Sequence, residues 1–483
     1  MRFPGATDSL CRMPTLAHRK QRRNEFLDLI KTPVLLMAGG QRARNYPQNV
    51  YPYRADATFL FFFANPEPDS AALFDPADGS VTLFLHERTV EDALWHGPVA
   101  SFSEIKESQG VTQVLPLATL EDSVVALAKR RKTHTVAVAD PKALARALAI
   151  TGETLEFERA DKSGHPDLIA AIAALRLHKG EEELAEIRKA AAITKEAHVL
   201  AMARTRPGIY EQDLAGLVDG CFARHGGVPA YNTILSVRGE VLHNHRHDNL
   251  LRETDIVLLD AGAEVASGYC ADVTRCWPVS GRFAAEGREI YEIVLRANEQ
   301  AIAAVAPGKR YRDVHLLAAR VIAEGLCDLG ILRGSQDALV ESGAPALFFP
   351  HGVGHLLGLD VHDMETYGDQ VAYAKGRMRS KQFGTAYLRL DLDLAPGMVV
   401  TIEPGIYFVP AILHDEKFRR QFKDQVDFAK AERFLTMHGL RGFGGIRIED
   451  DVVCTKTGHE VLTAAIPKER IAIEALTGCL PAP

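Results

Sequence analysis

One stretch of the chain, residues 255–275, constrains the fold more than any other. The apolar run Ile256–Leu259, the turn residues 266–268 and a second run that carries Asp272 together predict a β-hairpin. Asp260 would end one buried strand and Asp272 would lie on its neighbour, so two negative charges would share a poorly solvated place. A divalent cation between them is the simplest remedy. An Asp at a strand end is also a common turn or cap residue, so the hairpin alone leaves both interpretations open.

Composition narrows the class of protein. The chain has 483 residues, of which 47% are hydrophobic and 25% charged, as expected for a globular protein of about two to four domains. A net charge of −7 argues against nucleic acid as a partner. The seven cysteines are scattered without a CxxC pair, and no apolar run approaches membrane-spanning length. We therefore expect a soluble, cytoplasmic protein with reduced thiols.

The N-terminal part is predicted to be an α/β domain. Residues 15–30 have the pattern of an amphipathic helix whose basic residues are solvated. The runs typical of strands are 34–38, 58–63, 71–74, 81–85 and 135–139, and helical patterns at 87–94 and 120–129 lie between them. Turn residues at 161–166 interrupt the apolar pattern. We therefore expect two domains, residues 1–165 and 166–483, in an α/β (α+β) protein.

The second part begins with helices, predicted at 167–177, 181–202, 211–225, 285–306 and 311–329. His243, His245 and His247 alternate, so in a strand they would share one face. Such a row fits a metal-binding tract, although two of the three are as well explained as solvated side chains. We favour His243 as the functional one.

Three further fragments carry candidate site residues. His351, His355 and His362 lie within twelve residues among glycines, which let a backbone approach a ligand closely. Glu403 ends a predicted buried strand before a Pro-Gly turn. Strand alternation places Glu449 on the same face as Arg447, either as a metal ligand with its neighbour or as a simple ion pair.

The hairpin and these three fragments together contain two Asp, two Glu and one candidate His ligand, with no thiolate. Such an oxygen-rich set favours manganese, cobalt or zinc. Four carboxylates exceed the needs of one hydrolytic ion, but they suit two ions about 3.5–4 Å apart. The residues therefore predict a dinuclear metallohydrolase.

The chain resembles the creatinase/aminopeptidase, or pita-bread, peptidases, in particular the Xaa-Pro branch of aminopeptidase P and prolidase. Tyr51-Pro-Tyr-Arg54, followed by Phe59 to Glu67, is similar to the aminopeptidase P N-terminal domain, and the chain after about Pro166 resembles the catalytic domain. The resemblance implies a creatinase-like α/β domain over residues 1–165 and a pita-bread domain over residues 166–483.

The resemblance also implies residue roles. The implied metal ligands are Asp260, Asp272, His355, Glu403 and Glu449, with Asp272 and Glu449 bridging two ions. The implied substrate-binding and intermediate-stabilising histidines are His243, His351 and His362, and Tyr407 and Arg447 match a pair that supports the metal centre. Arg176 matches an arginine near the site.

The implied activity is hydrolysis of the bond between an N-terminal residue and proline, with two Mn²⁺ ions, or Co²⁺ or Zn²⁺, and Glu403 as general base. The expected partners are peptides with proline at the second position, and the expected assembly is a dimer or tetramer.

A prolidase restricted to dipeptides is the alternative, since Arg389 falls where its carboxylate-binding arginine is expected. A metal-free binding module is a third hypothesis. The loop 235–243 is shorter than is usual in the family, and insertions at 368–392 and 410–442 favour prolidase.

Overall fold

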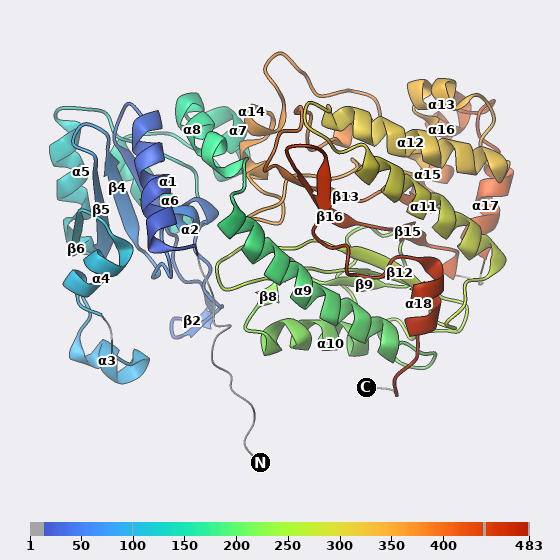
Figure 1. Cartoon of the computed structure of the whole chain (residues 1–483), viewed down its shortest axis with the longest axis horizontal. Helices are drawn as coiled ribbons and strands as arrows, with labels where there is room; N and C mark the ends of the chain where they lie inside the picture. The colour runs from blue at the N-terminus through green and yellow to red at the C-terminus, as the bar shows by residue number, and fades with distance from the viewer. Residues whose placement is uncertain (1–13, 99, 438–440, 482–483) are drawn as a thin grey trace. The chain divides into compact units, whose positions relative to one another are not determined.

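The computed structural model describes residues 14–98, 100–437 and 441–481, and divides the chain into two compact units. The N-terminal unit runs to Leu177 and includes Met364–Val371, and the C-terminal unit contains His178–Asp363 and Ala372–Pro483. Helices and strands alternate in both, as Figure 1 shows, which agrees with the predicted α/β (α+β) class. The unit boundary follows the helix α8 (Pro166–Arg176), whereas the sequence pattern predicted a boundary before it.

The N-terminal unit is built on a five-stranded sheet. Its order is β6 (Gln113–Pro116), β5 (Ser80–Leu85), β4 (Ala71–Asp75), β1 (Val34–Met37) and β7 (His134–Thr135). The outer pairs β5–β6 and β1–β7 are parallel and the inner pairs are antiparallel. One group of buried apolar side chains packs the sheet against α5 (Leu120–Ala128) and α6 (Pro141–Thr151). The remaining elements of this unit are α1 (Leu16–Leu29), β2 (Ala43–Tyr46), β3 (Asn49–Val50), α2 (Ala57–Phe62), α3 (Val90–His96), α4 (Phe102–Gln109) and α7 (Ala160–Ser163).

The strand predicted at residues 58–63 is wrong, because this segment forms the helix α2. Asp56 caps it, since its carboxylate accepts hydrogen bonds from the backbone N–H groups of Thr58 and Phe59. Aromatic and β-branched residues are typical of strands, but here the rings pack on one another, with Phe62 beside Phe26 and Phe74. The cap and the ring packing override the local preference.

The prediction that all basic residues of α1 are solvated is also wrong. Arg22 and Arg23 are 3% and 2% exposed. Arg22 donates to the carbonyl of Phe61 at 3.0 Å, and Arg23 donates to that of Phe62 at 2.7 Å. These carbonyls belong to the last residues of α2, where intrahelical partners are missing and the helix dipole attracts cations. The two arginines therefore cap the C-terminal end of α2.

The C-terminal unit repeats one construction twice, a helix pair followed by a three-stranded antiparallel sheet. The first half contains α9 (Glu181–Arg204), α10 (Glu211–Arg224) and the sheet β12 (Thr274–Pro278), β10 (Ile256–Asp260) and β9 (Ile234–Ser236). The second half contains α11 (Ala285–Ala303), α12 (Tyr311–Asp328) and the sheet β13 (Val399–Ile402), β16 (Asp450–Cys454) and β17 (His459–Val461). The helices of each pair pack together, and Figure 1 shows α9 and α11 in front of the strands.

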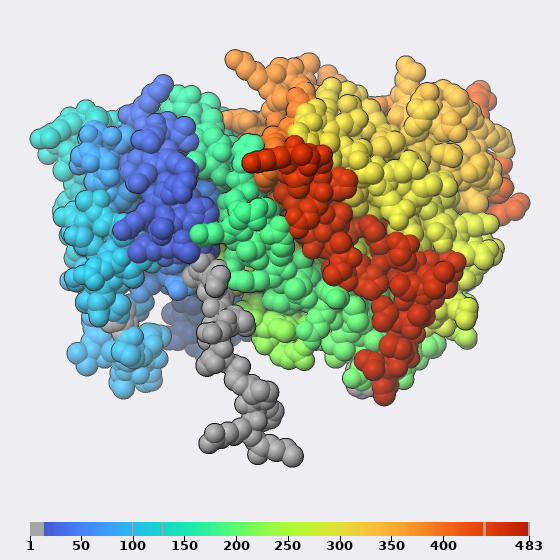
Figure 2. Space-filling model, viewed as in Figure 1, coloured from blue at the N-terminus to red at the C-terminus, as the bar shows by residue number. Residues whose placement is uncertain are grey.

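Smaller elements complete this unit. They are β8 (Val228–Pro229), β11 (Ala263–Glu264), β14 (Gly405–Tyr407), β15 (Gly445–Arg447), α13 (Gln336–Ser342), α15 (Pro410–Leu413), α16 (Glu416–Gln421), α17 (Phe428–Thr436) and α18 (Arg470–Leu476). The short helix α14 (Asp369–Ala372) spans a boundary between the two units. Figure 2 shows the C-terminal segment, in red, on the surface of this unit, where α18 packs on α9.

The described cysteines, Cys221, Cys270, Cys276, Cys327, Cys454 and Cys479, are free thiols. Cys11 lies outside the described residues. None of the helices within the described ranges combines the length and apolar character that a membrane crossing requires.

A fully buried ion pair joins the two halves of the C-terminal unit. Arg275 of β12 donates to Asp450 of β16 at 2.8 Å and to the carbonyl of Glu449 at 2.6 Å. Although burial opposes the charge, Arg275 and Lys468 lower the pKa of Asp450 to about 2. The strand β12 of the first half and the strand β16 of the second half are therefore held in a fixed relation.

Replacing Arg275 by Met should destabilise the protein by about 3–5 kcal/mol, because Asp450 would lose its main partner inside the core. The matched control is Arg320→Met, since Arg320 and its partner Asp337 are 51% and 75% exposed. The control should change the free energy of unfolding by less than about 1 kcal/mol. Urea unfolding measures both, and equal effects of the two substitutions would contradict this account.

Candidate metal centre

The first two candidate carboxylates are brought together by one antiparallel strand pair. Asp260 ends β10 and pairs with Thr274, the first residue of β12. Asp272 lies two residues before β12, so the predicted hairpin is correct in outline but Asp272 is outside its strand. Asp260 and Asp272 are 8% and 5% exposed. The connecting backbone is tightly packed, because a Cβ on Gly262 would lie 1.7 Å from the carbonyl oxygen of Ala271.

The second pair of carboxylates arises in the same way. Glu403 follows β13 directly, as predicted, and Glu449 directly precedes the antiparallel partner β16. Thr274 joins this pair to the first, since its hydroxyl donates to Glu449 at 2.6 Å and its carbonyl accepts the Glu449 N–H at 3.1 Å. Carboxylates from distant parts of the sequence therefore meet where two strand pairs end.

His355 completes the group. Its Nε2 lies 3.3 Å from a carboxylate oxygen of Asp272 and 3.8 Å from one of Glu403. Its Nδ1 lies 3.0 Å from the carbonyl of Leu356, so a proton on Nδ1 leaves the Nε2 lone pair directed at the carboxylates. Ligand atoms of Asp260, Asp272 and Glu449 lie within 4.8 Å of one another, and so do those of His355, Glu403 and Glu449.

The clustered acids strongly disfavour one another's charge. Burial, and then the charge of Asp260, raises the pKa of Asp272 to about 7. Burial raises the pKa of Glu403 to about 7 against the opposing effect of His355. The pKa of Glu449 is raised well above its ordinary value by burial and by the charges of Asp272 and Glu403. Such a group is stable only with protons or cations between its members.

The donor set fits divalent cations. Four carboxylates and one imidazole offer hard oxygen ligands and a borderline nitrogen, with no sulfur in the group. Two of the groups of ligand atoms share Glu449, and a third joins Asp272 and His355 to His362. Such overlapping groups suit two neighbouring ions with a shared carboxylate. The chemistry available to such a centre is hydrolysis.

Tyr231 is a site residue that the sequence did not reveal. Its hydroxyl lies 2.6 Å from Asp260 and 2.5 Å from Asp272, and burial and these charges raise its pKa well above the ordinary value. A tyrosine has one proton to donate, so the second contact needs a proton from a carboxyl group. No local pattern marks Tyr231, since it follows a short strand in a segment without periodicity.

Arg447 and Tyr407 form a hydrogen-bonded pair that contacts the carboxylate group through Asp260. Arg447 pairs with Asp260 and donates to the Tyr407 hydroxyl at 3.0 Å and to Thr274 at 2.9 Å. The Tyr407 hydroxyl lies 2.9 Å from Nε2 of His351, and burial together with the Arg447 charge lowers the pKa of His351 to about 3. His351 is therefore a neutral acceptor for the tyrosine proton.

Two of the three histidines in residues 243–247 line the same cavity, but they do not lie on a strand as predicted. Residues 240–249 contain no strand in the described structure, so the alternation of His243, His245 and His247 does not place them on a strand face. His243 and His245 nevertheless line the cavity, whereas His247 contacts the carbonyl of Thr233 at 3.1 Å. Burial, and then the charge of Arg447, lowers the pKa of His243.

The ring of His362 lies against that of His355, with centroids 4.0 Å apart and the planes inclined by 46°, and Arg389 donates to Nδ1 of His362 at 2.8 Å. Both therefore belong to the site region. Arg176 is a buried residue of the N-terminal unit, where it donates to Thr58 at 3.1 Å, and its place near the site stays a prediction.

The carboxylates open into a cavity of about 710 Å³ within the C-terminal unit. The wall combines the ligand group and the histidines with an apolar surface. The apolar part is formed by Ile234, Leu242, Val361, Phe383, Val409 and Ile412. A small peptide with a hydrophobic ring fits the size and character of this space.

Comparisons with known proteins agree with this geometry. A model of metallopeptidase family M24 matches residues 185–456, and a model of the aminopeptidase P N-terminal domain matches residues 19–137. The chain is 34% identical to the Xaa-Pro aminopeptidase of Escherichia coli over 441 residues, 88% of this chain and 89% of that one. It is 33% identical to a probable Xaa-Pro aminopeptidase of Aspergillus fumigatus over 435 residues, 88% of each.

Solved structures give the same result. Zinc-substituted aminopeptidase P of Escherichia coli, in complex with product, matches with a TM-score of 0.78 and 30% identity, covering 96% of this chain and 98% of that one. An aminopeptidase of Pseudomonas aeruginosa matches with a TM-score of 0.77 and 31% identity, covering 95% and 97%.

The fold and the site together define a metallopeptidase of the pita-bread type. The chain belongs to metallopeptidase family M24, and the predicted resemblance to the aminopeptidase P branch is confirmed.

Removing one carboxylate charge should stabilise the metal-stripped protein. An acid with a raised folded pKa binds its proton more tightly when folded, so stability falls as pH rises above the ordinary carboxyl value of about 4. Glu449→Gln removes this penalty and should raise the melting temperature more at pH 8 than at pH 5. Thermal melts in the presence of a chelator measure the melting temperature of both proteins. The contribution of the buried histidines to its pH dependence cancels, because both proteins contain the same histidines.

Glu253→Gln, which changes an exposed carboxylate, is the control and should have little effect at either pH. A Glu449→Gln protein that melts below the wild type at both pH values would contradict the electrostatic account.

Proposed function

We propose that the protein is an Xaa-Pro aminopeptidase, which removes an N-terminal residue from peptides with proline at the second position. The observation that carries the proposal is the buried group of four carboxylates and one imidazole in the wall of a peptide-sized cavity. The substrate class is supported by the match to the aminopeptidase P N-terminal domain and by relatives named Xaa-Pro aminopeptidases.

We assign the metal ligands as Asp260, Asp272, His355, Glu403 and Glu449, with Asp272 and Glu449 shared between two ions. When bound, two divalent ions supply a nucleophile at neutral pH and polarise the substrate carbonyl. Manganese suits a set dominated by carboxylates, and cobalt or zinc are the alternatives.

Glu403 is the proposed general base. Its carboxylate lies in the cavity wall, where it can face the attacking water. In the metal-free protein, burial raises its pKa to about 7. It takes a proton from the attacking water and returns it to the proline nitrogen as the peptide bond breaks. The proline nitrogen carries no hydrogen in the peptide and therefore must receive one to leave as an amine.

The other cavity residues bind and orient the peptide. We assign recognition of the free N-terminal amine to Asp260, which is held in place by Arg447 and Tyr231. His243, His351 and His362 line the cavity. We assign His243 and His362 to hydrogen bonding of the scissile carbonyl and its neighbours, and His351, whose Nε2 accepts the Tyr407 proton, to shaping the substrate-binding wall. The apolar wall receives the proline ring.

The closest competing function is that of a prolidase, which accepts dipeptides alone. Arg389 favours it, because a guanidinium in the cavity wall is suited to bind a free carboxylate. The third hypothesis, a metal-free binding module, finds no support in the relatives or in the complete ligand group. We rank the aminopeptidase first because the N-terminal region matches aminopeptidase P.

We further propose a cytoplasmic enzyme that forms a dimer or tetramer. The free thiols support a reducing compartment. The helix α3 exposes Val90, Leu94 and Trp95 by 90%, 75% and 71%, an apolar face suited to contact with another subunit.

The protein reconstituted with Mn²⁺ should release the first residue of a tripeptide that has proline in second place. The same tripeptide with alanine in that place should be cleaved at least about tenfold more slowly, since the pocket is shaped for the ring. Release of the free N-terminal amino acid measures both rates. Cleavage of dipeptides alone would favour prolidase, and a folded protein that binds no divalent metal and cleaves neither peptide would overturn the proposal.

Arg389→Met should reduce kcat/KM for an Xaa-Pro dipeptide by about tenfold or more, because a charge-assisted hydrogen bond to the carboxylate is worth about 1.5–3 kcal/mol. The tripeptide should lose less, since its carboxylate lies one residue further along. Arg333→Met is the control, because Arg333 is 59% exposed and does not line the cavity. An equal loss for both peptides would assign Arg389 a purely structural role.

A further inference from the structure

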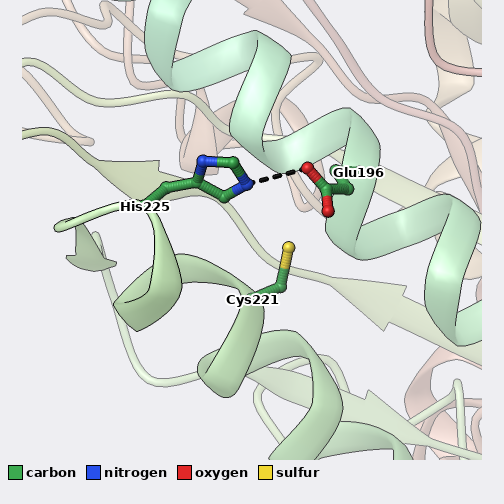
Figure 3. Close-up of side chains that lie close together, drawn as sticks. All are labelled: Glu196, Cys221 and His225. Carbon is green, nitrogen blue, oxygen red and sulfur yellow. Dashed lines mark hydrogen bonds and ion pairs between the residues drawn. The ribbon is translucent and has the colours of Figure 1, made fainter. Parts of the chain in front are cut away.

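Three side chains of different chemistry converge where α9 packs on α10, apart from the cavity. Glu196 belongs to α9, Cys221 belongs to α10, and His225 caps the C-terminal end of α10. One ligand atom of each lies within 4.8 Å of the other two. Figure 3 shows the sulfur of Cys221 and the ring of His225 both close to the Glu196 carboxylate. None of the three lines the cavity of the metal centre.

The helical framework fixes this arrangement. Cys221 and His225 are four residues apart, so they share one face of α10. The helix α9 packs along that neighbour and supplies the third group. Donors on packed helices are held more rigidly than donors on loops, which is what a binding site requires.

We propose that Glu196, Cys221 and His225 bind a single Zn²⁺-type cation. A thiolate, an imidazole and a carboxylate are all zinc ligands, and three protein ligands with a water in the fourth place form a common tetrahedral site. Tetrahedral zinc with bonds of about 2.0–2.3 Å separates its ligand atoms by about 3.3–3.8 Å. The three ligand atoms lie within 4.8 Å of one another, and the side chains must shift to these separations as the cation binds.

The exposure of the three groups provides an entry path. Cys221 is 4% exposed and lies beneath the surface, whereas the side chains of Glu196 and His225 are 43% and 38% exposed. A cation therefore approaches from solvent, and its fourth ligand is water. Arg224 pairs with one oxygen of Glu196, and the other oxygen lies 2.7 Å from Nε2 of His225.

Binding exchanges protons for the cation. Burial raises the pKa of the Cys221 thiol, so the sulfur is protonated until the cation displaces its proton to solvent. The same cation replaces the hydrogen bond between Glu196 and His225. A filled site would cross-link α9 and α10 and raise the melting temperature of the protein.

Cobalt provides a specific probe, because a Co²⁺–thiolate bond gives a charge-transfer band in the near ultraviolet. The full chain, with Mn²⁺ in the cavity, should develop this band on titration with Co²⁺ and saturate at one ion per chain. Co²⁺ that enters the cavity gives no such band, since the ligand group there contains no sulfur. Zn²⁺ added afterwards should remove the band.

Cys221→Ser should abolish the band, whereas the control Cys327→Ser, on α12, should keep it. Glu196→Gln and His225→Gln should weaken Co²⁺ binding by about 10–100-fold, as the loss of even supporting partners does in other sites. Circular dichroism verifies that each variant folds. If Cys221→Ser does not fold, the two variants at exposed positions, Glu196→Gln and His225→Gln, still test the site.

No band in the folded wild type would overturn the proposal and leave the three groups as a simple ion pair beside a thiol. A band that survives Cys221→Ser, or one unaffected by replacing both Glu196 and His225, would also overturn it. The cobalt band does not depend on peptidase activity. Failure of the zinc-site proposal can therefore be distinguished from failure of the proposed function.

Discussion

Repulsion among buried carboxylates is the constraint on which the C-terminal unit depends. Asp260, Asp272, Glu403 and Glu449 meet at a place with little access to water, and Arg447 brings one positive charge to the four. Each carboxylate makes its neighbours harder to ionise, so the group is completed by protons or by cations. The surrounding structure therefore maintains an arrangement that the carboxylates themselves oppose.

The strand pairs show how this is done. In an antiparallel pair, the end of one strand lies beside the beginning of its partner. Each half of the C-terminal unit places one acid at the end of its first strand and another just before the second, Asp260 with Asp272 and Glu403 with Glu449. Thr274 then hydrogen bonds Glu449, and the adjacent pair of Arg275 with Asp450 holds the halves together.

The sequence predicted those features that depend on neighbouring residues. Period-3.6 patterns located the long helices α9 to α12, and strand ends marked Asp260 and Glu403. Prediction from the sequence failed where contacts between residues far apart in the chain determine the local structure. The aromatic run that forms α2 looks like a strand until Asp56 caps it, and the buried arginines of α1 look solvated because their carbonyl partners come much later in the chain.

The candidate site shows the same division. Carboxylates and histidines set among glycines stand out in a sequence, whereas Tyr231 has no pattern and is recognised only by its hydrogen bonds to Asp260 and Asp272. Arg176 matches a site residue only by its position along the chain. Its guanidinium contacts Thr58 in the N-terminal unit, and its role at the site stays a prediction.

The most direct test of the central claim is an anomalous diffraction measurement on crystals of the protein grown with Mn²⁺. The account predicts two peaks about 3.5–4 Å apart, each within bonding distance of some of the five ligands Asp260, Asp272, His355, Glu403 and Glu449. An empty carboxylate group at saturating Mn²⁺, or ions bound only elsewhere, would contradict it.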